Sequence, residues 1–132
     1  MNVYVRALWN RLLGDRGERA AARFLRRRGC RVVTRGYRTA RGEIDLIVRD
    51  GDVLVFVEVK TRRAGVPVEA VTLEKRRRLT RAALEFVRRF HLSGVRARFD
   101  VVAIVWPDAG REPTIEHYVN AFEPPDLDPF SP

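Results

Sequence analysis

Apolar residues recur along the chain with two spacings, one typical of helices and one typical of strands. A repeat of three to four residues predicts helices over residues 14–28 and 73–92. Runs rich in valine, isoleucine and leucine, bounded by Gly, Asp and Pro, predict strands over residues 31–38, 43–49, 53–60, 96–106 and 113–119. The resulting order, α-β-β-β-α-β-β, predicts an α/β fold in which helices flank a mixed central β-sheet.

The strand over 53–60 is expected to lie at the centre of that sheet. It is apolar on both faces through Val57, which is the pattern of a strand covered on both sides. A helix separates it from the next strand, so we expect a right-handed parallel crossover between the two strands. The sequence predicts a single domain over residues 1–122 and a Pro-rich acidic tail over 123–132.

Three ionisable residues interrupt the apolar strands. Asp45 lies within one strand, and Glu58 and Lys60 share a face at the end of the next because strand side chains alternate. If Gly51 and Asp52 form the hairpin turn, Asp45 lies opposite Glu58. If Asp50 and Gly51 form the turn, Asp45 faces Phe56 and Glu58 is its diagonal neighbour. Either register places all three ionisable residues on one face, and only a three-residue loop would separate them.

Two opposed carboxylates repel each other, so either one is protonated or a divalent cation neutralises both. Oxygen ligands without a nearby His or Cys favour Mg²⁺ or Mn²⁺. With such an ion, Asp45 and Glu58 would form a phosphodiester-cleaving site, in which Lys60 orients water or stabilises the developing charge. Glu18, on the apolar side of the first helix, is a candidate third ligand, and Glu43 competes for that place. The alternative is a structural network of ion pairs, with Glu18 paired to a neighbouring arginine.

The distribution of charge suggests a polyanionic partner. The formal net charge is +9, and the excess of basic residues lies before residue 107, whereas the remainder is acidic. Nearly all basic residues are arginines, which suit bidentate contacts to phosphate. Nucleic acid, with DNA favoured, is therefore the first candidate partner. Arg62 and Arg63 directly follow the proposed site, and Lys75 opens the second helix, so these three are candidate phosphate contacts; the alternative is a solvated, arginine-biased surface.

Cysteine content and hydropathy limit the cellular setting. Cys30 is the single cysteine, so the chain can form no internal disulfide, and a free, partly buried thiol is expected. No apolar run approaches the ~18 residues of a membrane helix, and arginines interrupt the N-terminal segment. We therefore expect a cytoplasmic protein without membrane contact.

Several motifs together resemble one known group, the YraN family of bacterial proteins. They extend over residues 14 to 122, nearly the whole chain, and they are Gly17-Glu18, GEIDLI from Gly42, FVEVKTR from Phe56, RFDVV from Arg98 and NAF from Asn120. The resemblance implies the restriction-endonuclease-like fold of the PD-(D/E)xK class. The order of acidic residues is also similar to that of archaeal Holliday-junction resolvases, which are dimeric Mg²⁺ nucleases.

Residue by residue, this resemblance implies Glu18, Asp45 and Glu58 as metal-site carboxylates, Lys60 as the catalytic lysine, and a possible homodimer. The chain departs from the class name at Ile44, where a proline would stand before the aspartate.

Three functions remain open from the sequence. The first is a Mg²⁺-dependent endonuclease that acts on DNA, either branched or single-stranded. The second is a nuclease fold that binds nucleic acid without cutting it, and the third is an arginine surface that binds an acidic partner. Outside the proposed site, Asp100 beside Arg98 predicts a buried ion pair, and His91 and His117 are interpreted as structural.

Overall fold

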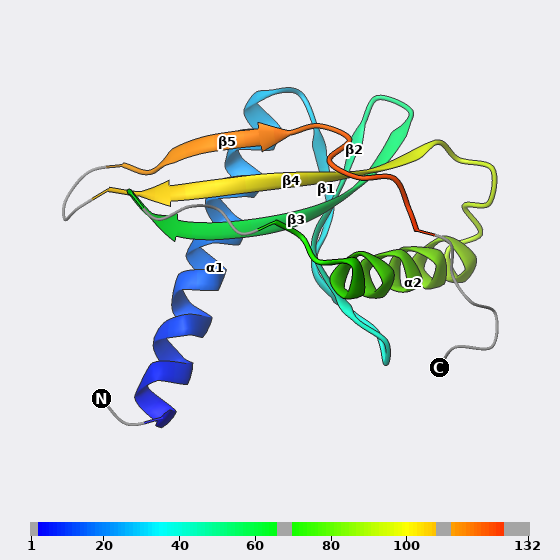
Figure 1. The fold of residues 1–132 in the computed structure, drawn as a ribbon. Helices are drawn as coiled ribbons and strands as arrows, with labels where there is room; N and C mark the ends of the chain where they lie inside the picture. The colour runs from blue at the N-terminus through cyan, green and yellow to red at the C-terminus, as the bar shows by residue number, and fades with distance from the viewer. Residues whose placement is uncertain (1–2, 66–69, 108–111, 126–132) are drawn as a thin grey trace.

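A computed structural model describes residues 3–65, 70–107 and 112–125, with side chains of the first helix described from Gly14 onward and at Tyr4. Within these residues, the fold consists of two helices and five strands (Figure 1). The helices are α1 (Val3–Arg27) and α2 (Leu73–Arg89), and the strands are β1 (Arg31–Arg38), β2 (Glu43–Asp50), β3 (Val53–Arg63), β4 (Ala97–Trp106) and β5 (Thr114–Tyr118). The predicted element order is confirmed, and the α/β architecture is consistent with a restriction-endonuclease-like core.

All five strands form one mixed sheet in the order β1-β2-β3-β4-β5, which places β3 at the centre, as predicted. β1, β2 and β3 are antiparallel neighbours, and β5 runs antiparallel to β4. β3 and β4 are parallel and are joined through α2, so the predicted parallel crossover is confirmed. The mixed sheet follows directly from this chain order, because short turns join antiparallel strands and a helix joins parallel ones.

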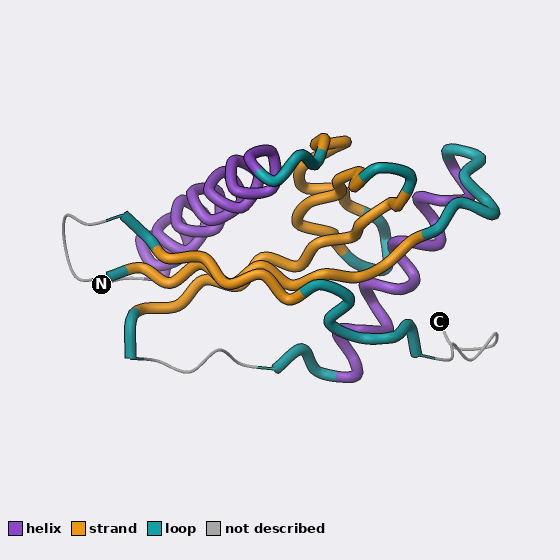
Figure 2. The backbone as a smooth tube through the Cα atoms, turned by 90° about the horizontal axis from the view of Figure 1, so that it is seen from above, coloured by secondary structure: helices purple, strands orange, loops and turns teal. Residues whose placement is uncertain are grey.

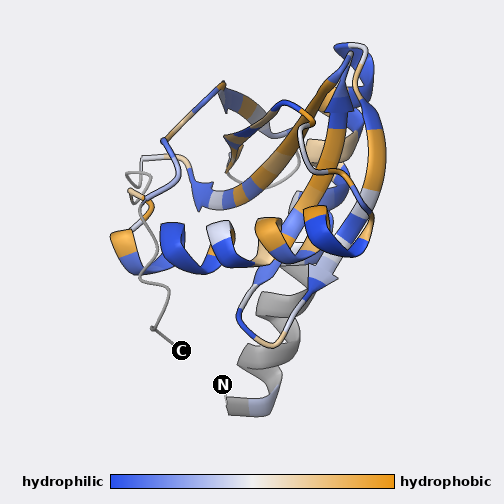
Figure 3. Ribbon diagram, turned by 90° about the vertical axis from the view of Figure 1, so that its right-hand side faces the viewer, coloured by the Kyte–Doolittle hydropathy of each residue, from blue (hydrophilic) through white to orange (hydrophobic). Residues whose placement is uncertain are grey.

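The two helices lie on opposite faces of the sheet (Figure 2). Each helix covers a separate core. Phe56 and Phe99 pack with Phe86 of α2 on one face. Val55 and Val57 pack with Leu25 of α1 on the other face. Figure 3 shows the alternation of hydrophobic and hydrophilic positions along α2 that this one-sided burial requires. Among the described residues, no helix is long and apolar enough to cross a membrane.

Helix α1 begins earlier than the sequence pattern predicted. It starts at Val3 rather than at residue 14, and Asp15 lies inside the helix, where it pairs with Arg19 at 3.3 Å. A glycine inside a helix costs about 1 kcal/mol and does not by itself end it. Gly17 has a packing role, because a Cβ there would lie 2.6 Å from Thr61 Cγ2 of β3. The helix ends at Arg27, one residue before the predicted end, and Gly29 follows with a φ of +92°.

The remaining boundaries differ by a few residues. The Thr72 side chain caps α2 by accepting a hydrogen bond from the Lys75 amide, and the helix ends at Arg89 rather than at residue 92. β3 continues to Arg63, three residues further than predicted. Cys30 is a free thiol, as expected, and it is buried rather than partly buried. Of the predicted tail over 123–132, residues 126–132 lie outside the described part of the chain.

Candidate metal centre

The candidate site lies where β2 separates from β3. The β2–β3 ladder runs from Asp50↔Val53 to Leu46↔Val57, so the register that places Asp45 next to Glu58 is the one observed. The β1–β2 ladder continues past this point to Glu43. At the separation, the Asp45 carboxylate accepts a hydrogen bond from the Val59 amide at 2.9 Å. The side chain of Asp45 therefore replaces the strand pairing that ends here.

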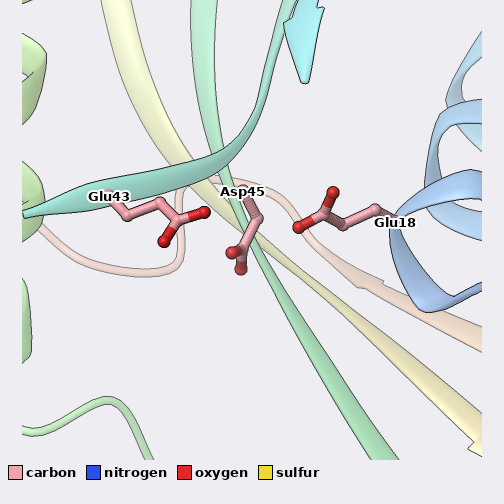
Figure 4. Close-up of side chains that lie close together, drawn as sticks. All are labelled: Glu18, Glu43 and Asp45. Carbon is pink, nitrogen blue, oxygen red and sulfur yellow. The ribbon is translucent and has the colours of Figure 1, made fainter. Parts of the chain in front are cut away.

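Three carboxylates meet at this point. Oxygens of Glu18, Glu43 and Asp45 all lie within 4.8 Å of one another. Figure 4 shows Glu18 entering from α1 while Glu43 and Asp45 enter from β2. The close contact of Gly17 with β3 holds α1 near enough for Glu18 to reach the strands. The structure thus brings in both the predicted ligand Glu18 and its competitor Glu43.

Glu58 adds a fourth carboxylate from β3. Its side chain is buried, and it lies close enough to Asp45 for its charge to raise the pKa of that carboxyl group. The Lys75 ammonium of α2 lies 2.6 Å from Glu58 Oε1. Lys75 therefore neutralises one carboxylate, whereas Asp45 faces other carboxylates.

The electrostatics of the site favour protons or cations. Burial, followed by the charge of Glu58, raises the pKa of Asp45 to about 7. Burial also raises the pKa of Glu18, with contributions from Glu43 and Asp15. Burial alone would lower the pKa of Lys75, but the hydrogen bond and charge of Glu58 and the charge of Asp45 outweigh it, so the net shift is upward.

The donor set fits a hard divalent cation. Its ligands are carboxylate oxygens from separate elements, which is the chemistry that Mg²⁺ and Mn²⁺ prefer. Glu18, Glu43 and Asp45 are close enough to share one ion, and Glu58 lies beside Asp45. Such an ion would offset both the burial and the repulsion by Glu58 that raise the pKa of Asp45.

The predicted basic residues occupy different surroundings. Lys60 is half-buried on the same strand as Glu58 and forms no ion pair within the described part of the chain. Arg62 lies 3.5 Å from Glu116 of β5, and Arg63 is exposed. Lys75, predicted as a phosphate contact, instead touches a site carboxylate in this structure. A cation in the first turn of a helix was the signal that marked it as unusual.

Asp100 is a second buried acid away from this site, and it is surrounded by hydrogen-bond donors. The predicted ion pair with Arg98 is confirmed, with contacts of 3.0 and 3.2 Å to Arg98 Nε and Nη2. His117 Nε2 lies 2.8 Å from the same carboxylate, and the Asn120 amide donates to it at 2.9 Å. Asp100 therefore holds β4, β5 and the following turn together.

Comparison with known proteins identifies relatives over most of the chain. The model of the "Uncharacterised protein family UPF0102" matches residues 17–104, a range that contains all four site carboxylates and both lysines. A UPF0102 protein of Geobacter sulfurreducens is 50% identical over 119 residues, covering 86% of this chain and 91% of the relative. A UPF0102 protein of Pelotomaculum thermopropionicum is 44% identical over 115 residues, covering 85% and 96%. One of Rhodopirellula baltica is 46% identical over 127 residues, covering 92% and 76%.

Proposed function

For this chain, which belongs to the UPF0102 family (the YraN family indicated by its motifs), we propose the function of a Mg²⁺- or Mn²⁺-dependent nuclease. It hydrolyses phosphodiester bonds in nucleic acid, with DNA as the favoured substrate, and it acts in the cytoplasm. The observation that carries the proposal is the convergence of Glu18, Glu43 and Asp45 beside Glu58.

The cluster has more negative charge than its own surroundings neutralise. Lys75 contacts Glu58, whereas the pKa of Asp45 is raised to about 7 by burial and neighbouring acid. A structural ion-pair network would place cations against each acid, as it does at Asp100. The deficit at Asp45 is what a divalent ion would correct.

Each residue then has a distinct role in hydrolysis. Glu18, Asp45 and Glu58 would hold the ion, with Glu43 as a further oxygen donor. The bound ion would supply a Lewis acid for the phosphate and lower the pKa of its water. The Lys60 ammonium, without an acidic partner among the described residues, is available to orient the attacking water or to stabilise negative charge on the phosphate.

One observation favours a second function, that of a nucleic-acid-binding module that no longer cuts. The 2.6 Å contact between Lys75 and Glu58 occupies one of the carboxylates that the ion would need. If this contact persists when metal is present, the site retains too few free ligands for catalysis.

Incubation of the purified chain with labelled DNA tests the first function against the second. Single-stranded, duplex and four-way-junction DNA are each incubated with Mg²⁺ or Mn²⁺. We expect cleavage of at least one substrate, reduced more than 100-fold in Asp45→Asn. Asp52→Asn, an exposed carboxylate in the turn of the same hairpin, is the matched control and should leave the rate unchanged.

The alternative function predicts a different pattern in the same assay. Binding of DNA without any product in either metal, unchanged in Asp45→Asn, would exclude the nuclease and support the binding module. Cleavage that persists equally in Asp45→Asn would assign the activity to a contaminant and contradict the proposal.

A further inference from the structure

We propose that a hollow between α1 and the outer part of the sheet binds the phosphate backbone of a nucleic acid. This arginine groove is lined by Arg16, Arg19, Arg23 and Arg27 of α1 and by Trp106 of β4. The inference rests on the proposed function and names the surface that would hold its substrate. None of these residues belongs to the carboxylate site.

The four arginines form one continuous row along α1. Their spacing of three or four residues places successive side chains on one side of the helix. With a rise of 1.5 Å per residue, the row from Arg16 to Arg27 is about 16 Å long. One strand of DNA carries a phosphate for every 3.4 Å or so of axis, so the row matches roughly five phosphates.

The row borders a true depression rather than a flat surface. The hollow has a volume of about 780 Å³, and its far wall comes from Trp106, Pro113 and Ile115. The Arg16 guanidinium lies 4.6 Å from the centroid of the Trp106 ring, which holds it at the wall. A guanidinium already ordered by a cation–π contact loses less freedom when it binds an anion.

Few carboxylates oppose this row. Glu112 is the acidic residue among those that line the groove, and Asp15 pairs with Arg19 from the side of α1. Arg23 and Arg27 are exposed and form no ion pair within the ranges that the structure describes. The groove therefore presents a net excess of unneutralised guanidinium groups.

The shape and charge favour a polynucleotide over an acidic protein or a free phosphate. A single phosphate would occupy only a fraction of a row of this length. Arginine forms planar bidentate contacts with phosphate. The regular spacing of the arginines matches the regular spacing of phosphates in a polynucleotide better than the irregular spacing of carboxylates on a folded protein.

The groove and the carboxylate site lie on different sides of the same helix. Glu18 points toward β2, whereas the arginine row faces β4 and β5. A helix with its side chains is about 10 Å across, so the two sides of α1 are only a few nucleotides apart. A polynucleotide that spans α1 can thus contact the arginines with one segment and reach the carboxylates with another.

The test is DNA binding by Arg23→Gln/Arg27→Gln in the absence of metal. Fluorescence anisotropy with labelled single-stranded and duplex DNA, in EDTA and at several salt concentrations, gives affinity and salt dependence. We expect at least a tenfold loss of affinity and a salt slope for duplex DNA reduced by about 1.8, the value for two phosphate contacts. Arg77→Gln/Arg88→Gln, which removes the same charge from exposed positions on α2, should change affinity less than threefold.

Further variants and competitors separate the possible outcomes. Arg23→Lys/Arg27→Lys keeps the charge and should retain most of the salt slope, which excludes misfolding as the cause of lost binding. If Arg77→Gln/Arg88→Gln loses as much DNA affinity as the groove variant, binding depends on the overall positive charge of the protein. That result would overturn the groove as the binding surface. Wild-type binding that polyglutamate abolishes but excess DNA does not would overturn it in favour of an acidic protein partner.

The result remains distinct from that of the cleavage assay. Cleavage by the wild type, with binding unaffected in Arg23→Gln/Arg27→Gln, overturns the groove and leaves the nuclease intact. Loss of binding in this variant, with no cleavage by the wild type, supports the groove and overturns the nuclease.

Discussion

Asp45 and Asp100 are both acidic residues in apolar strands, yet their surroundings are opposite. Asp100 is almost completely buried and accepts contacts from Arg98, His117 and the Asn120 amide. Asp45 accepts one backbone amide and otherwise faces carboxylates. Burial of an acid therefore does not identify a functional site; the charge of its neighbours does.

The largest expected effect is the loss of stability in Asp100→Asn. Removing the charge leaves Arg98 without its main partner beside the core, which should lower the free energy of unfolding by about 3 kcal/mol or more. Asp45→Asn should cost far less without metal, because it removes repulsion. Denaturant unfolding measures the free energy of unfolding of both variants. Equal losses of stability would contradict the difference between the two acids.

The dependence of stability on pH sharpens the same contrast. The pKa of Asp45 is raised from 3.8 to about 7, so the folded state binds this proton more tightly than the unfolded state. The resulting stabilisation is complete below pH 4 and is lost as pH rises to about 7. In metal-free buffer, the stability of the wild type relative to Asp45→Asn should therefore fall between pH 4 and pH 7. A flat difference across that range would contradict the raised pKa.

A smaller effect is expected when Lys75 is replaced by Met. Glu58 then lacks its cation, so the metal-free protein should lose about 1–3 kcal/mol of stability. The stabilisation by Mn²⁺ should become larger than in the wild type, because the ion no longer competes with an ammonium. Thermal unfolding with and without Mn²⁺ measures both, with Arg77→Met as control. A weaker response to Mn²⁺ would show that Lys75 assists metal binding instead.

The smallest effects are expected at the rim of the site. Glu43 is exposed and lies 3.6 Å from Arg38, so Glu43→Gln should weaken Mn²⁺ binding only several-fold. Glu18→Gln should weaken it more, because Glu18 is less exposed and its pKa is raised by burial. Calorimetric titration measures the Mn²⁺ affinity of both variants. A larger loss of affinity in Glu43→Gln than in Glu18→Gln would assign the ligand role to Glu43.

The sheet could be predicted because its signals are local. Runs rich in valine, isoleucine and leucine indicated the strands. The hairpin turn left two registers open, and the structure adopts the one that aligns Asp45 with Glu58. The role of Lys75 could not be predicted, because its contact with Glu58 depends on how α2 docks on the sheet. The predicted start of α1, at residue 14, was wrong, because the helix continues through Gly14 back to Val3. Gly17 inside it packs closely on β3, a contact that the sequence alone does not reveal.

Calorimetric titration with Mn²⁺ at pH 7.5 tests the central claim most directly. The wild type and Asp52→Asn should bind Mn²⁺ with similar affinity, and Asp45→Asn should bind at least tenfold more weakly. Equal binding by Asp45→Asn, or no binding by the wild type, would contradict the assignment of the carboxylate cluster as a metal centre.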